Sequence, residues 1–315
     1  MIVHHNLDHF KAKNPVITIG TFDGVHLGHR KVIDQLNEIA KRVGGESVLF
    51  TFYPHPRLVV SKDESNLRLL TTLEEKTLQM ERAGIDHMLV YPFDESFAAL
   101  SYQEFIGTIL IQKMGMHTLV VGHDHRLGRN REGTYDKIVA LSKQLNFKVQ
   151  KIDALLIDEV DISSSKIRKA LQDGEIVKVN NYLGYRFSIR GKVAVGNQIG
   201  RKIGFPTANV EASDPYKLIP AEGVYAIITE FDGKFYPSML NIGYRPTIDT
   251  NADRRTVETH LFNFNEDIYQ KEVTLHFYQR VRNEKKFSSL DELKAQLKKD
   301  EVKVREILRT ADLSQ

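Results

Sequence analysis

The segment GTFDGVHLGHRK, residues 20–31, contains one aspartate and two histidines at intervals of three residues. Asp23, His26 and His29 could bind a metal ion, although the segment offers no obvious fourth ligand. The histidines could instead cap the helix that follows. They could also act as cations or hydrogen-bond donors toward a triphosphate, because imidazoles beside a helix start can stabilise charge on a phosphoryl group. We favour the triphosphate, with Asp23 orienting one histidine.

Two further segments of the first half fit the same chemistry. ISSSKIRKAL (162–171) should open a helix with a serine cap. Cations in a first helical turn are mildly unfavourable, so Lys166 and Arg168 make more sense if one of them faces an anion. The loop GHDHRLGRNREG (122–133) adds Asp124 at the same sheet edge. The alternatives are a solvated basic face for the first segment and an ordinary surface loop for the second.

The second half has its own polar cluster in GRKIGFPTANV, residues 200–210. Thr207 and Asn209 would fall on one face of an extended segment, and their oxygens suit Mg²⁺ and phosphate. Glu258 shares a face with His260 in the strand-like run TVETHLF. If that face turns toward Thr207, Glu258 could deprotonate an attacking alcohol. A simple Pro-Thr-Asn turn and an exposed glutamate are the alternatives.

The first half alternates strand-like and helix-like segments, which implies a parallel sheet covered by helices on both faces. Ligands bind such sheets at the carboxyl ends of the strands, where residues 20–31 would lie. Thr72 and Glu75 form a capping-box pattern at one helix start. The expected strands are 16–20, 47–52, 87–93, 117–122 and 147–152, and the expected helices are 29–45, 71–84, 102–115, 135–146 and 163–174.

The pattern changes after about residue 180. Many short strands and one basic amphipathic helix at 290–309 suggest a small antiparallel barrel or sandwich. The polar, glycine-flanked segment 173–184 marks the boundary, which predicts domains of residues 1–180 and 181–315. The expected strands are 186–196, 223–231, 234–243, 255–264 and 272–282.

Composition excludes several classes of function. The 315 residues include no cysteine, which rules out disulfides, thiolate zinc sites and a cysteine nucleophile. The net charge of +3 does not argue for a nucleic-acid partner. The chain start does not resemble a secretory signal, and no run approaches the roughly 18 apolar residues of a membrane helix. We therefore expect a cytoplasmic protein with neither a nucleic-acid nor a membrane partner.

The combination of HLGH (26–29) with SSSKIR (163–168) resembles the HxGH nucleotidyltransferase superfamily. Together with TFYPHPRLVV (51–60) and RLLTTLEEK (68–76), it resembles the FMN adenylyltransferase domain of bacterial bifunctional FAD synthetases. This resemblance implies a Rossmann-like domain that transfers an adenylyl group from ATP to FMN and releases pyrophosphate. It implies catalytic His26 and His29, and as ATP-binding residues Gly20, Phe22, Asp23, Gly28, Asp124, Ser164 and Arg168.

The second half, with GFPTANV, EGVYA, LNIGYRPT, VETHLFNF and QRVRNEKKF in that order, resembles the riboflavin kinase domain of the same enzymes. This resemblance implies a six-stranded antiparallel barrel with a C-terminal helix, which phosphorylates riboflavin with Mg-ATP. Glu258 would be the catalytic base. ATP would be bound by Gly204, Thr207 and Asn209, Mg²⁺ by Thr207 and Asn209, and the flavin by Arg282 and Glu284.

The sequence departs from the family pattern at Tyr53, His125, Leu127, Asn263 and Gln270, and NQIGRK (197–202) is a variant of the kinase flap. We expect these departures to change affinity or rate, since none removes a residue assigned to phosphate chemistry. The whole pattern predicts a monomer or weak oligomer whose partners are ATP, riboflavin and FMN. The alternatives are an enzyme with only one of the two activities, and a regulatory protein that binds flavin or RNA.

Overall fold

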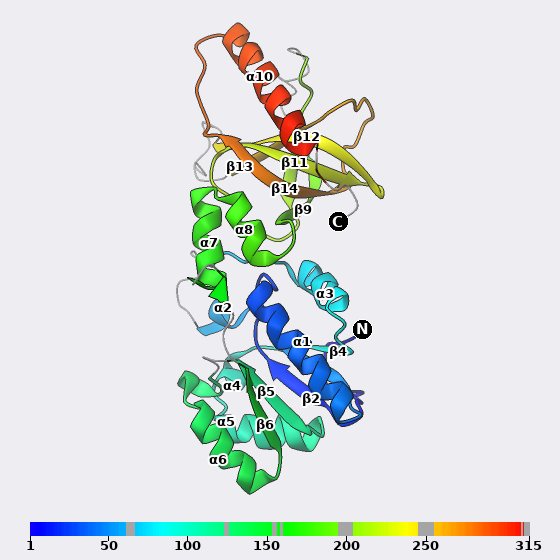
Figure 1. The fold of residues 1–315 in the computed structure, drawn as a ribbon, viewed down its shortest axis with the longest axis vertical. Coiled ribbons are helices and arrows are strands. Elements are labelled where there is room, and N and C mark those ends of the chain that lie inside the picture. The colour runs from blue at the N-terminus through cyan, green and yellow to red at the C-terminus, as the bar shows by residue number, and fades with distance from the viewer. Residues whose placement is uncertain are drawn as a thin grey trace. The chain divides into compact units, whose positions relative to one another are not determined.

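The computed structural model describes residues 1–60, 67–122, 126–152, 156–157, 160–194, 204–244, 255–309 and 311. The chain separates into two structural units, Met1–Ser164 and Ser165–Gln315 (Figure 1). Within the described part of the chain, no helix is both long enough and apolar enough to cross a membrane.

The first unit is built on a parallel sheet of six strands in the order β1-β4-β3-β2-β5-β6. The chain runs from β2 outward to β3 and β4, and then returns to β5 on the other side of β2. This reversal creates a topological switch point at the carboxyl ends of β2 and β5, where open α/β sheets bind ligands. The strands are β1 (Ile2–His4), β2 (Val16–Ile19), β3 (Ser47–Tyr53), β4 (His87–Pro92), β5 (Thr118–Gly122) and β6 (Lys148–Ile152).

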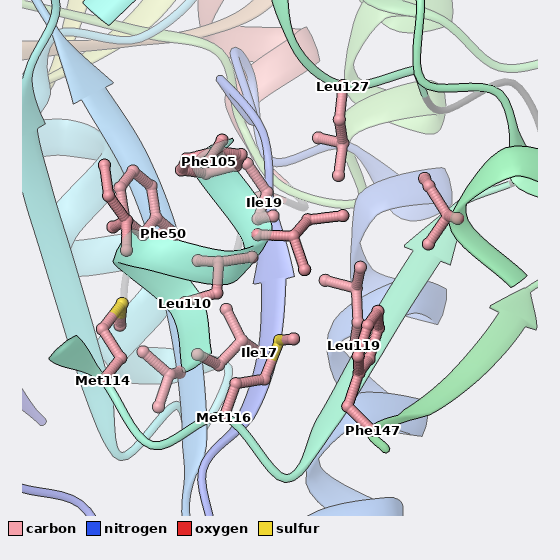
Figure 2. Close-up of a cluster of buried hydrophobic side chains, with 14 of the residues drawn as sticks. Ile17, Ile19, Phe50, Phe105, Leu110, Met114, Met116, Leu119, Leu127 and Phe147 are labelled. Carbon is pink, nitrogen blue, oxygen red and sulfur yellow. The ribbon is translucent and has the colours of Figure 1, made fainter. Parts of the chain in front are cut away.

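Helices cover both faces of this sheet, as the alternating pattern predicted. On one face α1 and α3 bury Ile33, Leu36 and Met80 against the strands. On the other, Ile17 and Ile19 of β2 pack against a second apolar cluster (Figure 2). The helices are α1 (Leu27–Arg42), α2 (Pro56–Val60), α3 (Leu73–Arg82), α4 (Glu95–Ala98), α5 (Tyr102–Glu104), η2 (Phe105–Lys113), η3 (Arg129–Arg131) and α6 (Tyr135–Leu145), and a small hairpin joins β7 (Leu156–Ile157) to β8 (Val160–Asp161).

Two elements of the first unit differ from expectation. The short edge strand β1 was not predicted, because its three residues show no clear burial pattern. The helix expected at 102–115 continues beyond α5 as a π-helix. Its buried residues recur in pairs four apart, which is also the pattern of an amphipathic α-helix, so the apolar spacing does not distinguish the two kinds of helix. These buried residues are Phe105, Ile106, Ile109 and Leu110.

The second unit contains a closed antiparallel barrel in the order β10-β13-β12-β11-β14-β9. Strand β9 also pairs with β10, which closes the ring. This confirms the predicted six-stranded barrel, although β10 was expected only as an extended loop. The strands are β9 (Ser188–Ala194), β10 (Ala208–Ala212), β11 (Gly223–Phe231), β12 (Lys234–Tyr244), β13 (Arg255–Leu261) and β14 (Glu272–Arg282).

Helices pack against this barrel from outside. Helix α10 (Leu290–Leu308) lies against the barrel (Figure 1). Its Val304 and Leu308 join the outward-facing Val224 and Ala226 of β11 in one apolar cluster. The chain enters the unit through α7 (Ser164–Asp173), which begins at the last residue of the first unit, and α8 (Ile176–Leu183). Helix α8 was not predicted, because the sequence there reads as a polar linker.

Asn180 explains why this polar segment is nevertheless folded. Its side-chain amide donates to the carbonyl of Phe277 at 2.9 Å and accepts from the N–H of Phe187 at 2.9 Å. The residue is only 5% exposed. A buried amide with both partners satisfied ties α8 to the barrel, since buried polar groups are stable only when hydrogen-bonded.

Candidate functional sites

The loop between β2 and α1 has an unusual backbone. Phe22, Gly24 and Val25 all have positive φ angles, of 46°, 86° and 36°. Such angles are uncommon for residues other than glycine and unfavourable for a β-branched side chain. Gly20 allows the bend, because a Cβ there would lie 3.0 Å from the Phe22 ring. The surrounding contacts must therefore hold this loop in place.

Asp23 provides those contacts and is 2% exposed. Its carboxylate accepts hydrogen bonds from the N–H groups of Leu70, at 3.0 and 3.1 Å, and of Thr71, at 3.0 Å. Its backbone carbonyl accepts one from the hydroxyl of Ser164 at 2.9 Å. Asp23 thus joins three segments that are distant in sequence. Its expected role, orienting a histidine, stays a prediction.

His26 caps α1 with its side chain. Its Nδ1 accepts from the N–H of His29 at 3.3 Å, so in the neutral ring the proton lies on Nε2. Gly28 makes room for this ring, because a Cβ there would lie 3.1 Å from Nδ1 of His26. The capping alternative is therefore confirmed for His26. Because His26 is the N-cap, α1 begins at Leu27, two residues earlier than expected.

His29 stacks on His26, with ring centroids 3.7 Å apart and planes inclined by 16°. The Phe22 ring also packs against His29, with centroids 4.7 Å apart and planes inclined by 44°. Its Nδ1 is buried without a hydrogen-bond partner among the described residues. Burial, followed by the charges of His26 and Lys76, lowers the pKa of His29 well below its usual value. His29 is therefore a neutral donor or acceptor near pH 7, and the cationic interpretation is not supported for it.

Lys76 on α3 is a charged neighbour that the sequence analysis missed. It is 7% exposed. Burial lowers its pKa to about 8, and the nearby Asp23 carboxylate opposes that shift. A sequence signal existed, because Lys76 lies four residues from both Thr72 and Met80, on the buried stripe of the helix.

The other predicted residues of this site are placed as follows. Arg168 lies on α7, in the second unit. Asp124 falls outside the described residues, as does His125. Leu127 is 5% exposed and belongs to the apolar core of the first unit. No cluster of three or more potential metal-binding His, Cys, Asp or Glu side chains occurs in the parts of the chain described, so the metal-site alternative gains no support.

The candidate residues of the barrel form one row across its outer surface. In the strand register, Asn209 of β10 is opposite Glu258 of β13, and Glu258 is opposite Asn241 of β12. The row continues through Val224 of β11 to Arg282 of β14. Directly opposite residues in antiparallel strands share a face. The structure thus brings Asn209 beside Glu258 and places Arg282 in the same row, three strands beyond Glu258.

The segment before β10 is fixed by His260. The Nδ1–H of His260 donates to the carbonyl of Pro206 at 2.7 Å, one residue before Thr207. The His260 ring also lies edge-on to Phe205 at 5.3 Å. Gly204 has a φ of 84°, which favours glycine at the start of this segment. His260 and Gly204 therefore set the path of the chain that presents Thr207.

Arg282 is held by helix α10. Its Nε and Nη2 donate to the carboxylate of Asp300 at 2.8 to 3.1 Å, and Asp300 is 2% exposed. Gln296 donates to the same carboxylate at 2.8 Å. The guanidinium also donates to the carbonyl of Asn283 at 2.9 Å, so it anchors the segment that follows β14. Its contact with flavin stays a prediction.

Glu284 contacts Asn241, a member of the row that contains Asn209 and Glu258. Its carboxyl is hydrogen-bonded to the Asn241 side chain. Burial, together with the neighbouring Glu222 carboxyl, raises the pKa of Glu284, while Asn241 and Arg282 lower it. A Cβ at Gly243 would collide with the Glu284 carboxyl, so glycine is required for this approach. Glu284 and Glu258 are thereby linked through Asn241.

Comparison with known proteins assigns both units. The family model for FAD synthetase matches residues 9–166, and the family model for riboflavin kinase matches residues 183–308. A bifunctional riboflavin kinase/FMN adenylyltransferase of Buchnera aphidicola (subsp. Schizaphis graminum) is 40% identical, with 94% of each chain covered. The Bacillus subtilis protein of that name is 38% identical over 94% of this chain and 93% of its own. The chain belongs to this family.

A solved structure supports the fold over the whole chain. The crystal structure of a Streptococcus pneumoniae protein described as a macrolide-efflux protein has a TM-score of 0.86 and 29% sequence identity. The match covers 96% of this chain and 98% of that protein. The bifunctional family therefore shares this two-part fold with a chain that has a different description.

Four residues at these sites were not identified as functional from the sequence: Lys76, Asn241, His260 and Asp300. Asn241, His260 and Asp300 are linked to predicted site residues or their neighbours by strand pairing or hydrogen bonds, and Lys76 acts on His29 through its charge. Asn241 had a weak signal, because it is a polar residue between the buried Leu240 and Ile242. Asp300 lies in a helix rich in charged residues, where nothing in the sequence distinguishes it.

Proposed function

We propose that the chain catalyses two consecutive ATP-dependent reactions, riboflavin to FMN and FMN to FAD. Residues 181–315 would be the riboflavin kinase and residues 1–180 the FMN adenylyltransferase. One observation carries the proposal. Each predicted set of site residues includes members that gather within the stretch matched by the corresponding family model: His26 with His29 in one, Asn209 with Glu258 in the other.

In the kinase reaction, Glu258 would accept the proton of the riboflavin 5′-hydroxyl. The oxygen then attacks the γ-phosphorus of ATP, the bond to the β-phosphate bridging oxygen breaks, and ADP leaves. Thr207 and Asn209 would hold the phosphates, with Gly204 allowing close approach. The pairing of Asn209 with Glu258 supports this arrangement, because it places the base beside a phosphate ligand.

Mg²⁺ fits the residues of this site. The Thr207 hydroxyl and the Asn209 amide oxygen, with the Glu258 carboxylate opposite, are the hard oxygen donors that Mg²⁺ binds together with nucleotide phosphates. The bound ion would neutralise part of the phosphate charge. We propose Thr207 and Asn209 as its protein ligands.

In the adenylyl transfer, a phosphate oxygen of FMN attacks the α-phosphorus of ATP. The α–β phosphoanhydride bond breaks and pyrophosphate leaves, without a covalent intermediate on the enzyme. His26, through Nε2–H, and neutral His29 would donate hydrogen bonds to the phosphate oxygens. Asp23 and Ser164 would position the loop, which also presents Gly20, Phe22 and Gly28 to ATP. Asp124 and Arg168 complete the proposed ATP ligands.

The flavin of the kinase reaction would bind at the end of the row opposite Asn209. Arg282 lies in that row, and Glu284 hydrogen-bonds to Asn241 beside Glu258. These positions support a role for Arg282 and Glu284 on the flavin side of the transferred phosphoryl group.

A flavin assay on the full chain tests the proposal. Riboflavin with Mg-ATP should give FMN and then FAD, separable by chromatography, and FMN with Mg-ATP should give FAD directly. Chelation of Mg²⁺ should stop FMN formation. Formation of neither product would overturn the proposal, and FMN without FAD would leave only the kinase. Flavin or RNA binding without ATP consumption would favour a regulatory protein.

We also propose that the enzyme is cytoplasmic, where ATP is supplied, and acts as a monomer or weak oligomer. Its partners would be ATP, riboflavin and FMN rather than nucleic acid or membrane. The small net charge of +3 supports this. Light scattering during size-exclusion chromatography would measure the mass in solution.

A further inference from the structure

Lys76 is a buried charge at the edge of the His26–His29 pair. Lysine is almost never this buried without a purpose-built partner, because taking an ammonium out of water is costly. Lys76 is 7% exposed. Its charge contributes to the lowered pKa of His29, and the Asp23 carboxylate favours the charged form of Lys76. Neither the capping of α3 nor the packing of the core requires a charge at this position.

The fold directs Lys76 to the site through Asp23. The Asp23 carboxylate binds the N–H groups of Leu70 and Thr71, and Thr72 then caps α3 with its hydroxyl. The carbonyl of Thr72 accepts from the N–H of Lys76 at 3.0 Å, so Lys76 lies one turn beyond the cap. The loop that carries His26 and His29 and the helix that carries Lys76 are therefore joined by one carboxylate.

The charged and titratable neighbours define the local electrostatics. From the β2–α1 loop comes the Asp23 carboxylate, and from α1 come His26 and His29. On α3 itself, Glu75 accepts from the N–H of Thr72 at 3.0 Å within the capping box. The Nδ1 of His29 is buried without a hydrogen-bond partner among the described residues. A cation in this group favours an incoming phosphate and disfavours a second cation on His29.

We propose that Lys76 is a positioning residue for the adenylyl transfer, whose ammonium supplies positive charge at the site near pH 7 and adds to the burial that keeps His29 neutral. His29 then meets phosphate as a hydrogen-bond donor that needs no proton rearrangement. The inference rests on the proposed adenylyltransferase function. It differs from a direct ATP contact, because Lys76 would act through His29 and through the field at the phosphates.

The titration of Lys76 gives this role a pH signature. Its pKa of about 8 implies that the charge is lost as the pH rises through 8. The kcat/KM of the adenylyl transfer for ATP should fall over the same range. The folded protein holds this proton less tightly than the unfolded chain, so the charge lowers stability near pH 7, and stability rises from pH 8 toward 10.5. A neutral substitute should therefore melt no lower than the original protein.

The experiment compares Lys76→Met and Lys76→Arg with the original chain, and uses Lys41→Met on the exposed end of α1 as the matched control. Lys76→Met should lower kcat/KM of the adenylyl transfer at pH 7 by roughly tenfold to a hundredfold. It should also abolish the alkaline limb near pH 8. Lys76→Arg should retain more activity and also lack that limb, because guanidinium stays charged. Riboflavin phosphorylation by the same preparations should not change.

A loss of less than threefold in Lys76→Met, or an alkaline limb that persists at the same pH in Lys76→Arg, would overturn the proposal. A readout without turnover separates it from the proposed function. In histidine-labelled protein, NMR should show the pKa of His29 rising in Lys76→Met, with the signal assigned by its loss in His29→Asn. An unchanged His29 titration overturns the role of Lys76 even if the enzyme makes FAD. No FAD from the original chain would instead sink the proposed function.

Discussion

The two candidate sites are held together in different ways. The His26–His29 site lies on a loop with three positive φ angles, kept in place by one buried carboxylate, Asp23. The site around Glu258 lies on regular strands, where the hydrogen-bonded register alone places Asn209 and Asn241 beside it. A loop site depends on a few side-chain contacts, whereas a strand site depends on the whole ladder.

The two sites also differ in how deeply their charged residues are buried. Asp23 and Lys76 of the first site are 2% and 7% exposed, and burial shifts the pKa values of Lys76 and His29 downward. Glu258 on the barrel surface is only partly buried. Pre-set charges suit a reaction in which one phosphate attacks another and no proton needs to move. An accessible carboxylate suits a reaction that must remove a proton from an alcohol.

The largest effect should come from Glu258→Gln. Losing the base should slow FMN formation by about a thousandfold, and FAD formation from supplied FMN should not change. Flavin chromatography with each substrate measures both rates. Glu266→Gln, an exposed glutamate in the turn after β13, is the control. Equal loss of both reactions in a folded variant would show that the two sites are not independent.

The reciprocal change is His29→Asn. Removing one donor to the phosphates should lower kcat for FAD formation by roughly a hundredfold and leave the kinase rate intact. Pyrophosphate release measures the first reaction, and ADP release measures the second. Substitution of the exposed His5 by asparagine is the matched control. If His29→Asn changes only the KM for FMN, His29 contributes to the binding of FMN and does not act on the transferred adenylyl group.

Asp300→Ala tests how strongly the barrel site depends on α10. It would leave Arg282, with a side chain 21% exposed, without its carboxylate. We expect a loss of about 2–3 kcal/mol in the free energy of unfolding, because breaking a buried pair leaves an uncompensated charge. Chemical denaturation measures this, with Lys298→Ala on the exposed side of α10 as control. An unchanged denaturation midpoint would mean that the pair contributes little.

The smallest effect should come from His260→Phe. It removes the hydrogen bond to the Pro206 carbonyl and keeps a ring against Phe205. A bond worth about 1.5 kcal/mol predicts roughly a tenfold rise in KM for ATP in the kinase reaction. Initial rates across ATP concentrations measure it, and the FAD-forming reaction is the internal control. A fall in kcat with KM unchanged would show that His260 acts on the transition state instead.

Much of the fold follows from local pattern. Alternating apolar strands and amphipathic helices predict the parallel sheet, and the Thr72–Glu75 capping box is present as expected. The elements that sequence reasoning missed lack a local signal. Strand β1 is three exposed or half-exposed residues, α8 depends on the doubly bonded Asn180, and β10 exists because it closes the barrel between β9 and β13.

The sequence by itself determined which residue types are available for phosphate chemistry and in what order they occur. The arrangement of His26, Gly28 and His29 at the start of the helix follows from local geometry alone, because Gly28 leaves room for the His26 ring. Only the tertiary structure decided that Asp23 binds Leu70 and Thr71, that Lys76 is buried, and that Asn241 stands beside Glu258. These relations join segments tens of residues apart, and burial and strand register are properties of the folded chain.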